Sequence, residues 1–172
     1  MYIISGPAGV GKSTTSKRLA ELFERSAYIE GDLINHMVVG GYLPPWESEE
    51  SLSLVWENIA DLSINFVQAR KDVVIDYVAF PEDVEKLSKR VYVEVKNVEI
   101  IYVVLWVDID ELLRRDALRM KEHQMGERCL ELVKEFEAKG VEERFLYHTT
   151  NLQPSNLGEI LQNIRENPRF KY

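Results

Sequence analysis

Short apolar runs alternate along the chain with longer segments in which hydrophobic residues recur every three or four positions. The short runs, which are typical of buried strands, lie at 2–4, 27–29, 73–75, 100–107 and 145–147. The helical period marks 17–25, 33–38, 49–70, 82–90, the segment after Asp108, 127–138 and 157–164. Strands that alternate with helices predict a parallel sheet with helices on both faces. Because no linker divides the pattern, we expect residues 1–172 to form a single domain.

Local patterns refine the predicted helices. The apolar face of the first helix is expected to carry Leu19, Leu22 and Phe23. The apolar stripe of the long helix consists of Leu52, Val55, Ile59, Leu62 and Phe66. Asp108 and Glu111 have the D-x-x-E spacing of a capping box, which predicts the start of a helix that carries Arg114, Arg115 and Arg119. Cys129 lies on an apolar helix face and is expected in the core.

The composition narrows the class of partner. The chain has 21 Lys and Arg against 29 Asp and Glu, a net charge of −8, which argues against nucleic acid and anionic membranes as partners. A single cysteine excludes an internal disulfide and fits a reducing compartment. The apolar run at 100–107 is too short to span a bilayer, and no signal peptide precedes the first strand. We therefore expect a cytoplasmic protein.

The chemistry is concentrated near the start of the chain. Residues 6–14 read GPAGVGKST and match the phosphate-loop pattern G-x-x-x-x-G-K-[ST] at every fixed position. The glycines let backbone N–H groups curl around a triphosphate, Lys12 is expected to reach the β- and γ-phosphates, and Ser13 to hold Mg²⁺. The predicted nucleotide-binding residues of the loop are Gly6, Ala8, Gly9, Val10, Gly11, Lys12, Ser13 and Thr14.

Further short motifs follow the later strands. They are IEGD at 29–32, VVID at 73–76, the arginines after the fourth strand and TTNLQP at 149–154. With the phosphate loop, and in this order, the chain resembles the small-molecule kinases of the phosphate-loop class, the group of gluconate kinase, shikimate kinase, adenylylsulfate kinase and chloramphenicol phosphotransferase. The resemblance implies the P-loop NTP hydrolase fold with a five-stranded parallel sheet in the order 2-3-1-4-5. It also implies ATP with Mg²⁺, an acceptor with a hydroxyl group, a mobile lid at about 114–128, and nucleotide contacts from Asn151 and Gln153.

The resemblance assigns roles to acidic residues at the ends of strands. Asp32 is expected to orient the acceptor hydroxyl and accept its proton, although it has the alternative of capping the short helix that follows. Glu30 stands where many relatives have Asp, and it is a candidate substrate contact. In the implied sheet order Asp76 lies beside the first strand, near Ser13, where it suits the metal or the substrate. Asp108 is the alternative candidate for binding the metal, but the capping-box spacing accounts for this residue without a metal.

Arginines after the fourth strand are candidates for stabilising the charge that develops during phosphoryl transfer. Arg115 and Arg119 are four residues apart on one predicted helical face, and Arg128 is expected to join them when the lid closes. The alternative is a solvated basic face in which Glu111 pairs with Arg115.

The acceptor is expected on the side of the second and third strands. His36 and Trp46 are candidates to line that pocket, although ordinary packing explains both as well. No Lys or Arg lies between Arg25 and Arg70, so a neutral or cationic acceptor rich in hydroxyl groups is favoured over a multiply charged anion. The sequence thus predicts an ATP-dependent phosphotransferase acting on a hydroxyl of a small molecule. The alternatives are a nucleotide or nucleic-acid-end kinase, and a nucleotide-binding regulatory ATPase.

Overall fold

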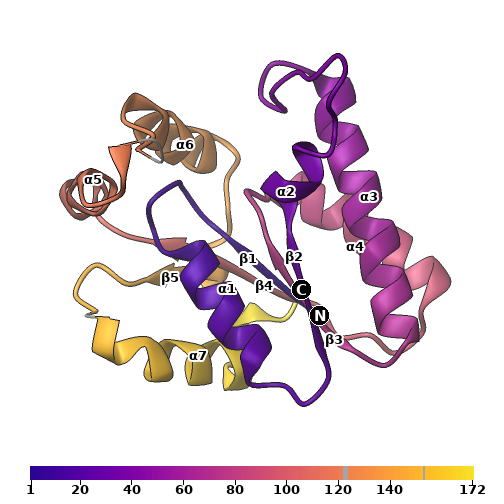
Figure 1. The fold of residues 1–172 in the computed structure, drawn as a ribbon. Coiled ribbons are helices and arrows are strands. Elements are labelled where there is room, and N and C mark those ends of the chain that lie inside the picture. Colours follow the sequence, from indigo (N-terminus) through magenta and orange to yellow (C-terminus); the bar gives the residue numbers. More distant parts are fainter. Residues whose placement is uncertain (122–123, 153) are drawn as a thin grey trace.

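Five parallel strands form the centre of the molecule (Figure 1). The computed structural model describes residues 1–121, 124–152 and 154–172. The strands are β1 (Tyr2–Ser5), β2 (Ser26–Glu30), β3 (Asp72–Asp76), β4 (Ile101–Trp106) and β5 (Leu146–His148). Their order in the sheet is β2-β3-β1-β4-β5, and all neighbours are parallel. The predicted fold class and strand order are therefore confirmed.

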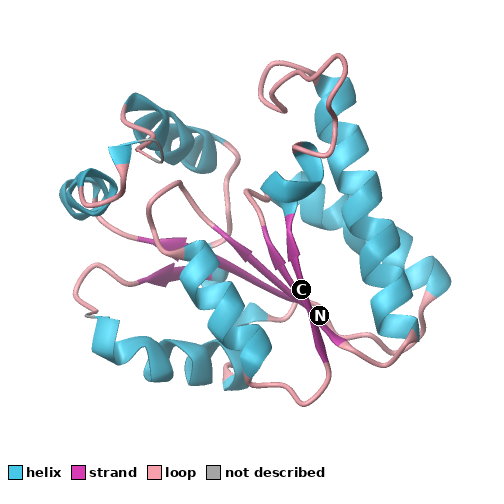
Figure 2. Ribbon diagram, in the orientation of Figure 1, coloured by secondary structure: helices cyan, strands magenta, loops and turns pink. Residues whose placement is uncertain are grey.

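Seven α-helices surround this sheet in the described parts of the chain (Figure 2). They are α1 (Lys12–Glu21), α2 (Gly31–Asn35), α3 (Glu49–Gln68), α4 (Pro81–Glu94), α5 (Ile109–Ala117), α6 (Glu127–Ala138) and α7 (Leu157–Glu166). Short 3-10 turns are η2 (Glu143–Phe145), η3 (Pro154–Asn156) and η4 (Pro168–Phe170). No helix of the described residues is both long enough and apolar enough to cross a membrane.

The two faces of the sheet build two hydrophobic cores, because successive residues of a strand point to opposite sides. On β1, Ile3 belongs to the core that α3 and α4 cover, whereas Ile4 belongs to the core that α1 and α7 cover. Both side chains are fully buried. Cys129 of α6 is buried in the second core, as its sequence pattern predicts. Helices on both faces leave the carboxyl ends of the strands as the open edge.

Some local predictions are wrong. Helix α1 ends at Glu21, so Leu22 lies beyond it and is 48% exposed. On α3, Leu62 lies outside the buried face and is 37% exposed, whereas Ser63 is buried. Helix α5 ends at Ala117, so Arg119 is no longer on a regular helix with Arg115.

Asp108 occupies the N-cap position of α5, but the predicted capping box is not formed. Its side chain makes no cap hydrogen bond. Its backbone N–H donates to the Thr150 hydroxyl at 2.9 Å, and the Glu111 carboxylate is held by arginines of its own helix. The β5–α7 connection therefore supplies the partner that the sequence pattern assigned to Glu111.

Candidate active site

The phosphate loop joins β1 to α1 and is fixed by close packing. Gly6 has φ 130°, and a Cβ added there would lie 2.3 Å from the carbonyl oxygen of Leu105 on β4. Only glycine can adopt this conformation so close to a neighbouring strand. Lys12 begins α1, and its Nζ donates a hydrogen bond to the Pro7 carbonyl at 3.0 Å. The loop thus curls back on itself, with the ammonium group inside the curve.

The sheet order brings the acidic strand ends to this loop. Asp76 is paired with Ile4 on one side and with Glu30 on the other. It is buried, and its Oδ2 lies 2.7 Å from the Tyr28 hydroxyl, which is also 3.1 Å from Glu30 Oε2. Glu30 is further paired with Lys17 at 3.5 Å. Glu30 is therefore held by Tyr28 and Lys17. Asp76 shares the Tyr28 hydroxyl and lies at the carboxyl end of the central strands, beside the phosphate loop.

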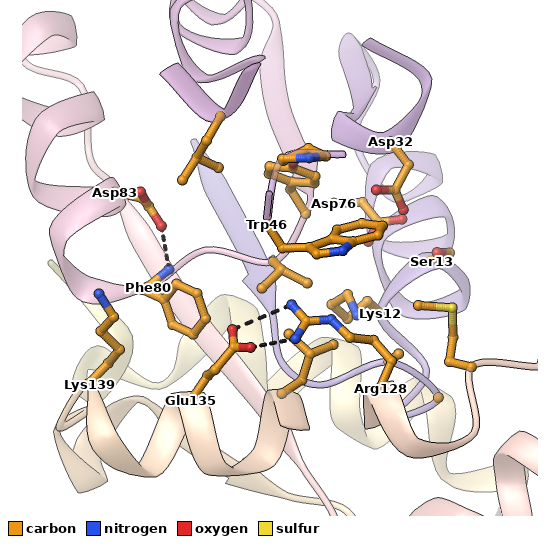
Figure 3. A pocket seen from close by; sticks show the side chains of 18 of the residues that line it. Lys12, Ser13, Asp32, Trp46, Asp76, Phe80, Asp83, Arg128, Glu135 and Lys139 are labelled. Carbon is orange, nitrogen blue, oxygen red and sulfur yellow. Dashed lines mark hydrogen bonds and ion pairs between the residues drawn. The ribbon is translucent and has the colours of Figure 1, made fainter. Parts of the chain in front are cut away.

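Asp32 lies at the same end of the sheet, in the first turn of α2, which begins at Gly31 directly after β2. A Cβ on Gly31 would lie 2.4 Å from the ring of Tyr77, so the glycine of IEGD serves close packing. The N-cap of α2 is Glu30, and Asp32 lies within the first turn rather than capping it. Its carboxylate has no hydrogen-bond partner among the described residues. Figure 3 shows it on the same side of the pocket as Lys12, Ser13 and Asp76.

The charges at this edge perturb one another. Desolvation lowers the pKa of Lys12, and the nearby carboxylates of Asp76 and Asp32 partly offset this effect. The pKa of Asp32 is raised, first by desolvation and then by the charges of Asp76 and Glu30, while Lys12 opposes the rise. The side chain is open to the pocket, yet protein atoms around it displace enough water to disfavour its charge. A carboxylate with a raised pKa is better suited to accept a proton.

Lys12, Asp32 and Asp76 line one end of a cavity of about 800 Å³, which we call the main cavity (Figure 3). The phosphate-loop residues that line it are Ala8, Gly9, Gly11, Lys12, Ser13 and Thr14. Its other walls come from residues 45–49, from the segment between Asp76 and Asp83, and from α6. Ala79 anchors the segment after β3. Its backbone N–H donates a hydrogen bond to the Ser5 hydroxyl at 2.8 Å, and its carbonyl accepts one from the Tyr102 hydroxyl at 2.7 Å. The segment that forms this wall of the main cavity is therefore tied to β1 and β4.

Three predicted arginines line this cavity, and each is already held by a carboxylate. Arg115 pairs with Glu111 and also donates to the carbonyls of Val10 and Thr149, at 3.2 and 3.0 Å. Hydrogen bonds from Arg114 and Arg115 lower the pKa of Glu111 to about 2. The pairing of Glu111 with Arg115 is thus present, but Arg115 is not a freely solvated side chain. It ties α5 to the phosphate loop and to the end of β5.

Arg119 and Arg128 belong to the segment predicted as a lid at about 114–128. Arg119 pairs with Asp116 at 3.3 Å. Arg128 pairs with Glu131 and Glu135, and its guanidinium lies 5.4 Å from the centre of the Trp46 ring. Trp46 is 59% exposed, so packing in the core does not explain it. The lid segment and the loop before α3 therefore meet across the main cavity.

A second cavity of about 600 Å³ lies on the other side of Arg115. Val10, Thr14 and Leu118 contribute to its walls, together with the β5–α7 connection. Asn151, a predicted nucleotide contact, is exposed in that connection and is not among the described residues that line the cavity. Gln153 lies outside the described residues. Two adjoining cavities joined at the phosphate loop suit a reaction between two bound molecules.

The structure does not bring every predicted substrate contact to the main cavity. Among the described residues that line it, Glu30 and His36 are missing. His36 stacks near the Tyr42 ring at 5.8 Å instead. Asp108 is exposed and lines neither cavity. Sequence reasoning missed the lining residues Phe80, Glu82, Asp83, Glu135 and Lys139. The FPED sequence at 80–83, which lies at the start of α4 and is separated from β3 by residues 77–79, is the signal that was available for the first three.

The oxygen donors at the phosphate loop fit Mg²⁺. Among the described residues no group of three or more His, Cys, Asp or Glu side chains could hold a metal ion. Mg²⁺ commonly takes only one or two protein oxygens and completes its shell with water and phosphate oxygens. The Ser13 hydroxyl and the Asp76 carboxylate are such oxygens, and both line the main cavity.

The fold is shared with phosphate-loop kinases. It is similar to a gluconokinase from Sinorhizobium meliloti 1021, with 22% identity, coverage of 95% of this chain and 87% of that chain, and a TM-score of 0.60. A shikimate kinase from Bacteroides thetaiotaomicron is 19% identical, with 96% of both chains covered and a TM-score of 0.59. The Deinococcus radiodurans tunicamycin resistance protein is 18% identical, with 95% and 92% covered and a TM-score of 0.61. These likenesses confirm, at the level of the fold, the resemblance inferred from the motifs.

A family model described as an AAA domain matches residues 3–139, which run from β1 to the end of α6. The chain belongs to this family. No curated protein sequence matches it.

Proposed function

We propose that this protein is an ATP-dependent kinase that transfers the γ-phosphoryl group to a hydroxyl of a small molecule. The observation that carries the proposal is the position of Asp32. Its carboxylate, which has no hydrogen-bond partner among the described residues, lines the same end of one cavity as Lys12, Ser13 and other phosphate-loop residues, and its charge is coupled to Lys12. A protein that only binds nucleotide has no need of such a carboxylate. The fold shared with gluconokinase and shikimate kinase supports the same reaction class.

Each residue has a role in this reaction. The backbone of the phosphate loop and the Lys12 ammonium hold the phosphates, and the second cavity takes the nucleoside. Ser13 and Asp76 hold Mg²⁺, which offsets phosphate charge when bound. Asp32 orients the acceptor hydroxyl and takes its proton as the new O–P bond forms, while the bond from the γ-phosphorus to ADP breaks. Arg119 and Arg128 line the same cavity, and in this proposal their charges stabilise the negative charge that develops on the transferring group.

The charges of the main cavity support a neutral or cationic acceptor. Among the described residues, its lining has seven carboxylates, from Asp32, Glu47, Glu49, Asp76, Glu82, Asp83 and Glu135. The same described lining has five cationic side chains, from Lys12, Arg115, Arg119, Arg128 and Lys139. Lys12 serves the nucleotide and the arginines are already paired, so an anionic acceptor would meet repulsion rather than a free counter-charge.

Measurement of ADP release with ATP, Mg²⁺ and a panel of hydroxylated molecules tests the proposal. We expect release to depend on the acceptor, and Asp32→Asn to lower it about a hundredfold or more while ATP binding persists, because general-base catalysis has this scale. Glu30→Gln is the matched control at the same strand end. A larger loss in Glu30→Gln than in Asp32→Asn would move the base to Glu30. Slow ADP release that ignores every acceptor would indicate a regulatory ATPase instead.

A further inference from the structure

Of the three arginines that line the main cavity in the described parts of the chain, Arg119 is the least engaged by protein partners. Arg115 is held by a carboxylate and two backbone carbonyls, and Arg128 by two carboxylates and an aromatic ring. The guanidinium of Arg119 has one partner among the described residues, because its Nη1 donates to Asp116 Oδ1 at 3.3 Å. A guanidinium has five N–H donors, so most donors of Arg119 are left for a ligand.

The helix that leads to Arg119 is packed against the phosphate loop. A Cβ added to Gly9 would lie 3.4 Å from Leu112 Cδ1 and 3.8 Å from Asp116 Cβ, which are ordinary van der Waals distances. The same helix, α5, is tied to the loop by the hydrogen bond from Arg115 to the Val10 carbonyl at 3.2 Å. The last turn of α5 is therefore fixed directly beside the loop that binds phosphate.

The two oxygens of the buried Asp116 carboxylate serve different partners. Only 4% of this residue is exposed. Oδ2 accepts the backbone N–H groups of Met125 and Gly126, at 3.1 and 2.9 Å. Oδ1 accepts the Arg119 guanidinium, and it shares the N–H of Met125 at 3.1 Å. One oxygen therefore fixes the chain that returns to α6, and the other holds the guanidinium.

Arg119 is held close enough to the phosphate loop for its charge to act there. Desolvation is the main cause of the lowered pKa of Lys12, and the charge of Arg119 adds to that lowering. Both side chains line the main cavity together with Ser13. Two cations at such a position repel each other, and a phosphate group between them would relieve the repulsion.

We propose that Asp116 is a positioning residue for the proposed reaction: it holds the Arg119 guanidinium beside the phosphate loop, where that guanidinium contacts the transferring phosphoryl group. This inference rests on the proposed function and adds a residue to it. Asp116 is not among the described residues that line the main cavity, so it acts through Arg119. A cation that is held in place before the reaction stabilises the developing charge without losing side-chain freedom in the transition state.

The variant Asp116→Asn separates the two tasks of this side chain. The amide oxygen can take the place of Oδ2 and keep both backbone hydrogen bonds, whereas the amide nitrogen is a donor and cannot pair with Arg119. Asp110→Asn is the matched control, because it removes an exposed charge from the first turn of the same helix. Arg119→Ala removes the guanidinium itself, and the double variant Asp116→Asn, Arg119→Ala completes a double-mutant cycle.

Two measurements follow the contact between Arg119 and the phosphoryl group. The first is the calorimetric affinity for ADP with aluminium fluoride and Mg²⁺, a mimic of the transferring group, relative to ADP with Mg²⁺ alone. The second is the turnover number for ADP release with the most active acceptor of the panel. We expect Asp116→Asn, Arg119→Ala and the double variant to lower both quantities by the same factor of about ten or more, with the affinity for ADP unchanged. Asp110→Asn should change neither quantity.

Cys129 provides a check that the fold around position 116 is intact. It is the single cysteine of the chain and is buried. Burial raises the pKa of its thiol, and the neighbouring Asp116 carboxylate adds to that rise. The rate at which a thiol reagent modifies Cys129 therefore reports any opening of the structure around Asp116. We expect Asp116→Asn to leave this rate unchanged.

The outcomes separate this inference from the proposed function. An unchanged preference for the fluoride complex in Asp116→Asn, or no such preference in the unaltered protein, would overturn the positioning role. Losses that multiply to about a hundredfold in the double variant would also overturn it, because independent sites add in free energy. Rapid modification of Cys129 in Asp116→Asn would show that the carboxylate maintains the fold instead, and would overturn the role as well. ADP release that ignores every acceptor, with the fluoride effect intact, would remove the kinase proposal alone.

Discussion

Asp32 has a cost in stability that its proposed role explains. The pKa of Asp32 in the folded protein is raised by desolvation and by Asp76 and Glu30. A raised folded pKa means that ionisation at neutral pH weakens the folded state, because the unfolded carboxyl ionises freely near pH 3.9. The contribution of Asp32 to the free energy of unfolding is therefore most favourable below the unfolded pKa, where the carboxyl is protonated. This contribution is lost as the pH rises through the folded pKa. Functional sites commonly carry such costs.

We therefore predict that Asp32→Asn raises the melting temperature at pH 7, even though it removes the proposed base. The gain should shrink as the pH falls through the folded pKa and vanish below about pH 3, under the unfolded pKa of about 3.9, where Asp32 is protonated in both states. Thermal unfolding at a series of pH values measures the effect. Glu24→Gln, which removes an exposed charge with no ion-pair partner among the described residues, is the control. A gain that is the same at every pH would indicate that charge at position 32 is not the cause.

Tyr28 is a residue whose importance only the structure reveals. Its hydroxyl lies 2.7 Å from the Asp76 carboxylate, and Lys17 lies over its ring at 5.4 Å. If Asp76 holds Mg²⁺ as proposed, this hydrogen bond fixes the direction of the free carboxylate oxygen. We predict that Tyr28→Phe raises the Mg²⁺ concentration needed for half-maximal ADP release by about tenfold, with little effect on folding. Tyr92→Phe, at an exposed position of α4, should leave the Mg²⁺ dependence unchanged.

At the scale of elements, hydrogen bonds to the Asp116 side chain join α5 to the segment just before α6. The buried carboxylate of Asp116 accepts the N–H groups of Met125 and Gly126, at 3.1 and 2.9 Å, and pairs with Arg119. Burial alone would raise the pKa of Asp116, but these hydrogen bonds outweigh it and lower the pKa. Arg119 is thus held at the base of the predicted lid. The mobility of that lid stays a prediction.

This arrangement predicts different consequences for two arginines. Arg119→Ala should lower the turnover number about tenfold or more and change ATP affinity little, because a cation directed at developing charge acts in the transition state. Arg115→Ala should weaken ATP affinity as well, because Arg115 also holds the carbonyls of Val10 and Thr149. Steady-state kinetics with ATP titrations separate the two effects. Lys121→Ala, an exposed neighbour in the lid segment, is the control.

The elements themselves were largely predictable, and the exceptions have physical reasons. Strands β2 and β3 end in the carboxylates Glu30 and Asp76. The sequence alone places these two residues at the same end of the sheet, because parallel strands share their carboxyl ends. Helix ends were harder to predict. The run from Leu113 to Met120 contains no glycine or proline to stop it, yet α5 ends at Ala117 because Asp116 captures the chain that returns to α6. Such a long-range contact leaves no local pattern.

At the scale of the whole molecule, sequence reasoning found the phosphate end of the site and named Trp46 and Arg128, but it missed Phe80, Asp83 and Glu135. The phosphate loop and Asp32 lie within motifs of consecutive residues, so their meeting follows from the strand order. Trp46, Asp83 and Arg128 come from three separate parts of the chain and meet only through packing. The 5.4 Å contact between Arg128 and Trp46 is an example, because no spacing along the chain indicates it.

Nucleotide binding should stabilise the entire fold, because the phosphate loop connects β1 with α1 at the centre of the sheet. A ligand at about one hundred times its dissociation constant adds roughly 2.7 kcal/mol to the free energy of unfolding. For a chain of this length that corresponds to a rise in melting temperature of roughly 5–10 °C. We predict such a rise with ATP and Mg²⁺, and its loss in Lys12→Ala, which removes the charge at the phosphates. Arg18→Ala, an exposed residue of the same helix paired with Glu21, should keep it. An unchanged rise in Lys12→Ala would contradict the assignment of residues 6–14 as the phosphate site.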